Sequence, residues 1–146
     1  MQHKNEKDKK QALLKAADQI YQAWNRAWAN NDVDGLLALY TDDVIVESPL
    51  IPYLLGITRG VCEGKTAFRR LLEIAAERKP TNRQYYRNNY FTDGKTLIWE
   101  YPRVSPDEEQ MDFVEVMELR DGLICRHRVY WGWFGFDILK KDKYYR

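Results

Sequence analysis

The sequence is poor in the features that mark metal sites, disulfide-bonded folds and membrane segments. Only Cys62 and Cys125 are cysteines, and no CxxC or HxxxH spacing occurs, which disfavours both a zinc site and a disulfide framework. Lys and Arg number 23 against 22 Asp and Glu, so no net field attracts nucleic acid or an anionic membrane. No apolar run is long enough to span a bilayer, and residues 1–10 are too polar for a signal peptide. We therefore expect a cytoplasmic protein with no metal, no nucleic-acid partner and no membrane partner.

Aromatic residues are present in excess. The chain has five Trp and ten Tyr among 146 residues, and such rings line small-molecule cavities as well as cores and interfaces. A chain of this length suits one domain with a substantial core. We expect a polar lead-in over residues 1–10, a single domain over 11–139 and a polar tail over 140–146.

Helical periodicity dominates the first half of the chain. Apolar residues recur at helical spacing from about residue 11 and predict a long amphipathic helix that ends near Asn30. Asp32 is suited to cap a short second helix that extends through Tyr40. Residues 65–79 predict a third helix, which a following proline stops.

A short strand over residues 44–47 leads into an unusual segment, residues 48–63, that we expect to be a loop. The segment carries large apolar residues between prolines and glycines (Leu50, Ile51, Tyr53, Leu54, Leu55 and Ile57). Such residues need a partner, so the loop is either a lid over a ligand cavity or a cover for the end of the core or a second subunit.

The second half of the chain, from Arg83 to about Ile138, is predicted to be all strand. A first hairpin turns at Asp93 and Gly94, and a two-residue turn there gives a defined set of cross-strand pairs (Tyr90 with Leu97, Asn88 with Trp99, Tyr86 with Tyr101 and Arg87 with Glu100). Helices followed by an antiparallel meander define an α+β domain in which helices cover one side of a curved sheet.

The second hairpin, MDFVEVMELRDGLICRHRVYW, holds one carboxylate and one imidazole among apolar residues. A three-residue loop over 120–122 would place Glu115 directly opposite His127 and would bury one apolar row. A two-residue Asp-Gly loop would instead place Glu115 opposite Arg128, as an ordinary surface ion pair. We favour the first register, because the second puts Arg126 and Arg128 among apolar side chains.

The ordered set of segments resembles the nuclear transport factor 2-like superfamily. The strand that ends in VESP, the helix that opens with GKTAFRRLLE and the closing hairpin look most like its SnoaL-like polyketide cyclase and ketosteroid isomerase branch. The resemblance covers roughly residues 11–135. It implies a cone of helices and bent sheet around one hydrophobic pocket, a homodimer, and proton-transfer chemistry without a cofactor.

The residues that the resemblance carries over are a mixed set. Ser48, with Glu47 beside it, stands where ketosteroid isomerases have a general-base aspartate. Trp24 stands where they have an oxyanion-binding tyrosine, and an indole N–H is a donor only. Glu115 matches the position of their second oxyanion donor. Steroid isomerisation by the familiar residues is therefore not expected.

Two functions remain open for this chain. In the first, an isomerase, cyclase or dehydratase acts on a small hydrophobic or polyketide-like molecule. His127 accepts or donates the proton. Glu115 orients the imidazole ring and stabilises its cation, and Trp24 polarises an oxygen. Further side chains are expected to contact the substrate (Trp131, Tyr40, Ser48 and Tyr53). In the second, the histidine and glutamate are a structural pair, and the protein binds a ligand or a protein partner without catalysis.

Overall fold

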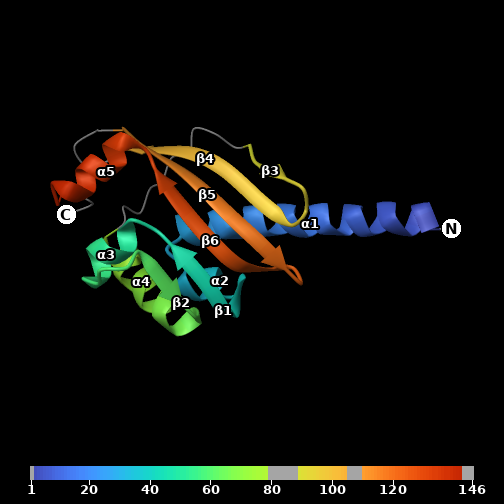
Figure 1. The fold of residues 1–146 in the computed structure, drawn as a ribbon, viewed down its shortest axis with the longest axis horizontal. Coiled ribbons are helices and arrows are strands. Elements are labelled where there is room, and N and C mark those ends of the chain that lie inside the picture. Colours follow the sequence, from blue (N-terminus) through green and yellow to red (C-terminus); the bar gives the residue numbers. More distant parts are fainter. Residues whose placement is uncertain (1, 79–88, 105–109, 143–146) are drawn as a thin grey trace.

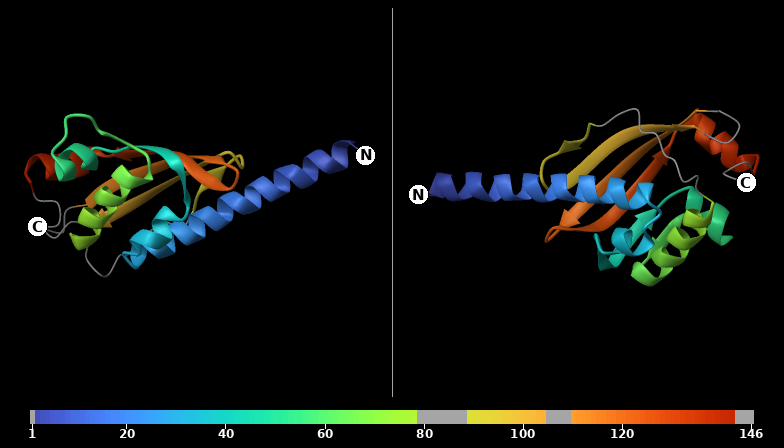
Figure 2. Two further views of the ribbon diagram at one scale, coloured as in Figure 1. Left: turned by 90° about the horizontal axis from the view of Figure 1, so that it is seen from below. Right: turned by 180° about the vertical axis from the view of Figure 1, so that it is seen from behind.

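The computed structural model describes residues 2–78, 89–104 and 110–142, and it consists of a bent sheet with helices on one face (Figure 1). Two further views place helices α1, α2 and α4 on the same side of the sheet, with α3 and α5 near the end opposite the N-terminus (Figure 2). In chain order the elements are α1 (Gln2–Ala29), α2 (Val33–Leu37), β1 (Tyr40–Glu47), α3 (Leu50–Leu55), β2 (Val61–Glu63), α4 (Lys65–Glu77), β3 (Phe91–Thr92), β4 (Thr96–Val104), β5 (Gln110–Arg120), β6 (Leu123–Trp131) and α5 (Trp133–Lys140).

The described strands form one six-stranded sheet in the order β2-β1-β6-β5-β4-β3. The predicted α+β class, with N-terminal helices packed on a curved sheet, is confirmed. One pairing differs from a purely antiparallel sheet, because β1 runs parallel to β6 and places Val46 beside His127. This parallel pair joins the helical half of the chain to the closing hairpin.

Helix α1 begins at Gln2, well before the apolar periodicity does. Its buried residues repeat at helical spacing and form the face that packs on the sheet (Ala17, Ile20, Tyr21, Trp24 and Ala27). Residues 5–13 are exposed, and that end of the helix projects beyond the sheet (Figure 1). The polar residues at the N-terminus therefore continue the helix. The other long helix, α4, buries the face that its spacing predicts (Phe68, Leu71, Leu72 and Ala75).

The second helix is shorter than predicted. Asp32 caps it, as expected, by accepting a hydrogen bond from Gly35 N at 2.8 Å. The helix ends at Leu37, however, and Tyr40 is the first residue of strand β1. Pairing with β6 draws this segment into the sheet and leaves Tyr40 only 1% exposed, so the prediction of helix at Tyr40 is wrong.

Residues 48–63 contain helix α3 and strand β2, so the predicted loop is wrong. Ser48 Oγ accepts a hydrogen bond from Leu50 N at 3.1 Å and starts the helix, while Gly56 ends it in the left-handed conformation at φ 66°. Leu50 and Ile51 are buried in the main core cluster. The apolar residues of this segment therefore pack as a short helix against the end of the core.

The hairpin between β3 and β4 has a longer connection than predicted. Thr92 pairs with Leu97, so four residues, 93–96, separate the first paired residues of the two strands, and the predicted Tyr90–Leu97 pair is wrong. Asp93 Oδ1 accepts hydrogen bonds from the backbone N–H groups of Lys95 and Thr96 at 2.8 and 2.7 Å, which stabilises the wider turn. The other three predicted pairs fall on residues 86–88, outside the described residues.

Residues 133–138 were predicted as strand, and they belong to helix α5. Gly135, Ile138 and Leu139 are buried at helical spacing, whereas Trp133 and Phe134 are 73% and 66% exposed. Aromatic residues are typical of strands, and here they are exposed. One of the buried positions of the helix is a glycine, so the sequence shows no apolar helical period.

Candidate active site

The hairpin formed by β5 and β6 has neither of the two registers considered from the sequence. Arg120 pairs with Leu123, and Asp121 and Gly122 turn with φ of 53° and 77°, which makes a two-residue loop. The predicted three-residue loop is therefore wrong. Beyond Ile124 the register shifts at a β-bulge, where Cys125 is the extra residue on β6.

The bulge brings Glu115 and His127 together diagonally rather than directly opposite each other. Glu115 pairs with Val129, and His127 pairs with Met117. The two-residue turn moves the pairing by one residue and the bulge moves it by one more, so side chains keep the faces that were predicted. His127 Nε2 lies 2.5 Å from Glu115 Oε2, and each residue is 3% exposed.

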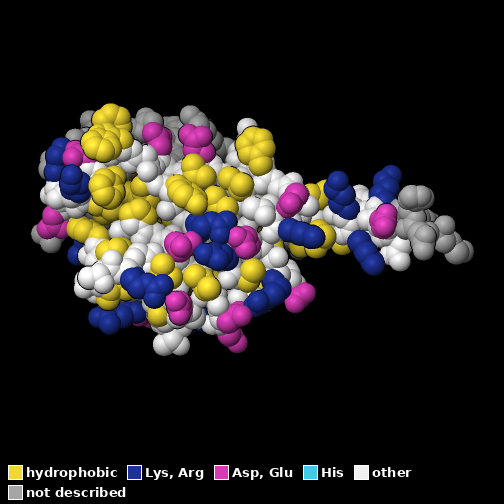
Figure 3. All heavy atoms as spheres, in the orientation of Figure 1, with side chains coloured by type: hydrophobic (Ala, Val, Ile, Leu, Met, Phe, Trp, Pro, Cys, Tyr) yellow, Lys and Arg dark blue, Asp and Glu magenta, His cyan; other side chains and the backbone are white. Residues whose placement is uncertain are grey.

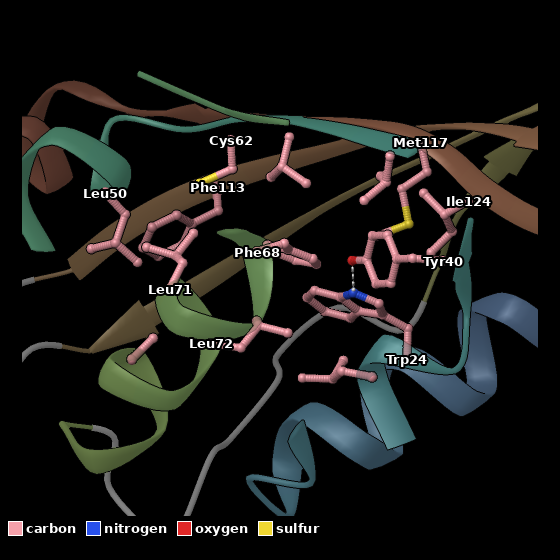
Figure 4. Packing of buried hydrophobic residues seen from close by; sticks show 14 of the residues in the cluster. Trp24, Tyr40, Leu50, Cys62, Phe68, Leu71, Leu72, Phe113, Met117 and Ile124 are labelled. Carbon is pink, nitrogen blue, oxygen red and sulfur yellow. Dashed lines mark hydrogen bonds between the residues drawn. The ribbon is translucent and has the colours of Figure 1, made fainter. Parts of the chain in front are cut away.

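A single chain of hydrogen bonds links this pair to the first helix. Trp24 Nε1 donates to Tyr40 Oη at 2.9 Å, and Tyr40 Oη lies 3.0 Å from His127 Nδ1. Both nitrogens of the imidazole are therefore engaged, one by Tyr40 and the other by Glu115. The Trp24 indole nitrogen and the Tyr40 hydroxyl, which form the first of these hydrogen bonds, face each other within the core (Figure 4).

Burial sets the chemical state of Tyr40. Removal from water raises the pKa of the phenol well above its usual value of 10.0, and the negative charge of Glu115 raises it further. The hydrogen bond from Trp24 acts in the opposite direction and lowers this pKa. The phenol is therefore protonated at neutral pH.

A cavity of about 50 Å³ lies beside the chain of hydrogen bonds. Its polar lining consists of Tyr40, Ser48, Glu115 and His127, and no Lys or Arg of the described residues lines it. The remaining wall is apolar and comes mainly from α1, α4 and the hairpin (Trp24, Trp28, Phe68, Leu72, Phe113 and Trp131). One water molecule needs roughly 10–15 Å³, so the cavity holds a few waters or a small fragment, and a larger ligand requires the wall to move.

Most of the residues predicted for the site do line this cavity. Trp24, Tyr40, Ser48 and Trp131 do so together with the Glu115–His127 pair. The structure does not bring Tyr53 into the cavity. Its hydroxyl donates to Asp142, and its ring lies under the guanidinium of Arg78, 5.6 Å from the centroid. Tyr53 is therefore not among the residues that line this cavity.

Trp24 lines the cavity with its indole N–H directed at Tyr40. An indole has one N–H donor, and that donor is already bound to Tyr40. Sequence reasoning missed the contact between Tyr40 and His127, because the two residues lie 87 positions apart and meet only through the parallel pairing of β1 and β6. The contribution of α4 to the wall could have been inferred from its apolar face.

Two further properties bear on the nature of the site. Within residues 2–78, 89–104 and 110–142, no three His, Cys, Asp or Glu side chains are grouped as metal ligands would be. In the same part of the chain, no helix combines the length and the apolar character that crossing a bilayer requires.

Residues 21–127 match the SnoaL-like domain family. The chain belongs to this family. No curated protein matches the chain significantly. Solved structures with the same fold are similar at low sequence identity, so the SnoaL-like chain shares their architecture, and a shared fold does not define the chemistry of the site.

Three of these structures illustrate the similarity. TerC co-crystallised with polyporic acid has a TM-score of 0.67 at 17% identity, covering 86% of this chain and 98% of TerC. A SnoaL-like protein of unknown function from Burkholderia thailandensis has a TM-score of 0.63 at 20% identity, with 80% and 94% covered. An NTF2-like protein of unknown function from Burkholderia pseudomallei has a TM-score of 0.66 at 12% identity, with 84% and 95% covered.

Proposed function

We propose that this SnoaL-like protein is a cofactor-independent enzyme that performs acid-base chemistry on a small hydrophobic or polyketide-like molecule, as an isomerase, cyclase or dehydratase. The observation that carries the proposal is the buried contact of 2.5 Å between Glu115 and His127 at the wall of an apolar cavity. Ionisable groups that converge in an enclosed apolar pocket are the usual mark of a catalytic site.

The energetics of burial favour a functional role over a structural one. Taking an ion pair out of water costs several kcal/mol per ion, and well-packed apolar residues often stabilise a core as well or better. Glu115 and His127 are nevertheless each 3% exposed. A pair that serves only packing would be replaceable by leucine-like residues, whereas proton exchange requires ionisable ones.

The roles that we propose differ from those expected from the sequence. Both nitrogens of His127 are engaged, by Tyr40 and Glu115, so the imidazole does not itself reach a ligand. The Glu115 carboxyl is the group that takes a proton from the ligand, and His127 orients this carboxyl and shares its proton. Trp131 and Ser48 shape the wall around the reacting atoms.

The ligand is small and largely uncharged in this proposal. The lining has one carboxyl group and no described Lys or Arg, so a highly charged molecule would be buried with little compensation. TerC, which has the same fold, was co-crystallised with polyporic acid, and this supports a small organic ligand.

Hydrogen-deuterium exchange at the α-carbon of small ketones tests the proposal, because it reports proton abstraction without a known substrate. We expect the wild-type protein in D₂O to accelerate the exchange, followed by NMR, and Glu115→Gln to reduce the acceleration by about 10²-fold or more. Glu118→Gln is the matched control, since Glu118 is on the same strand and binds Arg128 outside the cavity. Equal rates for wild type and Glu115→Gln would contradict the proposal.

The second candidate is a non-catalytic member that binds a ligand in the same cavity. The contacts of both His127 nitrogens with protein groups favour this candidate, because ionisable groups that already have partners are also found in structural networks. It predicts that ketones bind to the protein with no acceleration of exchange, so the same experiment separates the two functions.

The protein is further proposed to form a homodimer through the outer face of its sheet. Large apolar side chains are exposed on this face and on α5 (Phe91, Ile98, Tyr130, Trp133, Phe134 and Phe136), and they gather on one side of the molecule (Figure 3). Exposed apolar patches of this kind mark interaction surfaces. Sedimentation at increasing concentration tests this: Tyr130→Glu is expected to give a monomer, and a monomeric wild type would refute it.

The two cysteines bear on the compartment in which the protein acts. Cys62 and Cys125 are both free thiols, and free thiols persist in reducing compartments. This supports the proposal that the protein is cytoplasmic.

A further inference from the structure

Ser48 is held between β1 and α3 by three hydrogen bonds. Its backbone N–H donates to Gly60 O at 3.0 Å, and its carbonyl accepts from Ile51 N at 3.1 Å. Its side-chain oxygen accepts from Leu50 N, also at 3.1 Å. The backbone around Ser48 is therefore fixed on both sides, and this fixes the place of Oγ at the cavity wall.

The hydroxyl of Ser48 keeps a proton to donate. A serine hydroxyl has one proton and two lone pairs, and the contact with Leu50 N uses only a lone pair. No described residue accepts the proton. Ser48 is only 8% exposed, and a buried donor without an acceptor is costly. An oxygen of a ligand in the cavity would supply the acceptor.

The sheet divides next to Ser48, at the point where β1 leaves β6. The last pairs between these strands are Val46 with His127 and Glu47 with Arg128. Strand β6 continues to Trp131 and leads into α5, whereas the chain after Glu47 turns into α3 (Figure 1). The edge of β6 beyond Arg128 is therefore not paired with β1.

A groove of about 300 Å³ lies at this division. Its lining comes from the end of β1, the residue before β2 and the unpaired part of β6 (Glu47, Ser48, Pro49, Gly60, Arg128, Val129 and Tyr130). Ser48 and Val129 also line the inner cavity of about 50 Å³. These two residues are therefore the wall between the cavity and the groove.

Both charged side chains of the groove are paired within the sheet. Glu47 Oε2 lies 3.5 Å from Arg126 Nη2, and Arg128 Nη1 donates to Glu118 Oε1 at 2.6 Å. Because each charge has a partner of opposite sign, the groove does not require a charged ligand. The ring of Tyr130, which is 55% exposed, offers it an apolar surface instead.

We propose that the ligand is an elongated, neutral carbonyl compound with one arm in the cavity and one in the groove, and that Ser48 donates a hydrogen bond to its oxygen where the two spaces meet. This inference rests on the proposed function and specifies the ligand of the same site. The side chain of Val129 is the part of the wall that moves to join the two spaces. The groove then supplies the room that the cavity lacks.

The assignment gives the proposed reaction a group that binds the oxygen. When Glu115 takes the proton from the carbon next to the carbonyl, the electron pair of the broken C–H bond moves towards the carbonyl oxygen. A hydrogen-bond donor at that oxygen stabilises the developing charge. The N–H of Trp24 is already bound to Tyr40 at 2.9 Å, whereas the proton of Ser48 faces the same cavity as Glu115 without a described acceptor.

A matched pair of probes tests the donor. Cyclohexyl methyl ketone and isopropenylcyclohexane have the same shape, but only the ketone accepts a hydrogen bond. We expect Ser48→Ala to lower the ratio of ketone affinity to alkene affinity about fivefold, the value of one net hydrogen bond, in NMR titrations. Ser48→Thr keeps the hydroxyl and should keep the ratio. A substitution that merely loosened the start of α3 would weaken both probes alike and leave the ratio unchanged.

A series of ketones tests the groove. Cyclohexyl ketones with methyl, propyl and pentyl chains present the same ring and oxygen with a growing tail. We expect the pentyl ketone to bind the wild type about tenfold or more tightly than the methyl ketone, because each fully buried methylene adds about fourfold. Tyr130→Ala removes a groove side chain that does not line the cavity, and it should lower this gain about threefold.

Phe134→Ala is the matched control for the groove. Phe134 is an exposed aromatic residue of the same apolar surface, and it does not line the groove. Any effect that acts through the proposed dimer would appear in both variants. The gain from methyl to pentyl ketone should therefore be unchanged in Phe134→Ala, and an equal fall in both variants would overturn the place of the tail in the groove.

The outcomes separate this inference from the function on which it rests. An unchanged affinity ratio in Ser48→Ala, or equal binding of the methyl and pentyl ketones to the wild type, would overturn the inference. The proposed function would still stand if the wild type accelerated exchange at the α-carbon of the methyl ketone and Glu115→Gln did not. A wild type that binds none of these ketones would overturn both. A lowered ratio in Ser48→Ala, with a length gain that only Tyr130→Ala reduces, supports the inference.

Discussion

The two faces of the β5–β6 hairpin hold ion-pair contacts of almost the same length in opposite surroundings. On the outer face, Arg128 Nη1 lies 2.6 Å from Glu118 Oε1, and the side chains are 25% and 44% exposed. On the inner face, His127 Nε2 lies 2.5 Å from Glu115 Oε2, and the side chains are 4% and 3% exposed. Because the distances are almost equal, the position of each contact relative to the core determines how it affects stability.

Exposure to water means that the outer contact contributes little to the free energy of unfolding. An exposed pair contributes about 0–1 kcal/mol, because solvent screens the charges and the side chains lose freedom. The inner contact has no such screening, so removing one partner leaves the other polar group buried without that contact. The outer contact is therefore largely screened by solvent, whereas the inner contact is not.

The largest effect is expected from breaking the inner pair. His127→Leu leaves Glu115 buried without its partner, and we expect the free energy of unfolding to fall by about 3–5 kcal/mol, measured by urea denaturation. The double variant His127→Leu with Glu115→Leu should recover most of this loss, because it removes both polar groups. Equal losses in the single and double variants would contradict the comparison.

An effect of intermediate size on the free energy of unfolding is expected when the pH is raised above 10, because of Tyr40. Its pKa is raised in the folded protein, so its stabilisation is complete below pH 10 and is lost as the pH rises towards the folded pKa. Between pH 10 and the folded pKa, the unfolded state has lost a proton that the folded state keeps. The free energy of unfolding of the wild type should therefore fall by about 1.4 kcal/mol per pH unit more than that of Tyr40→Phe.

Denaturation of both proteins between pH 9 and 11 measures this difference. The other tyrosines with raised pKa values, Tyr53 and Tyr90, are present in both proteins and cancel. Parallel pH profiles for wild type and Tyr40→Phe would show that Tyr40 is not buried as described.

The smallest effect is expected on the outer face. Arg128→Leu, the same type of substitution one residue along the strand, should cost less than about 1 kcal/mol, and the cost should shrink in high salt. Urea denaturation at low and high ionic strength measures it. A cost close to that of His127→Leu would remove the distinction between the two faces.

The sequence predicted the features that follow from local periodicity. The apolar spacing of α1 and α4 identified both helices, and strand alternation placed Glu115 and His127 on one face. That placement survived a wrong register, because the turn and the bulge at Cys125 together shift the pairing by two residues, which returns the side chains beyond the bulge to their predicted faces.

Features that depend on distant contacts were not predictable. Tyr40 was assigned to a helix from its local pattern, and it joins the site because β1 pairs in parallel with β6. Helix α5 was missed because its exposed aromatic residues resemble a strand. The link between Tyr40 and His127 thus required the fold, since no local pattern encodes a pairing of strands so far apart.

A crystal structure of the protein soaked with cyclohexanone tests the central claim most directly. We predict density for the ketone in the cavity, with its ring against the apolar wall and an α-carbon beside the Glu115 carboxyl. Density only on the outer face near Tyr130, or a cavity closed by its own side chains with no ketone inside, would contradict the account.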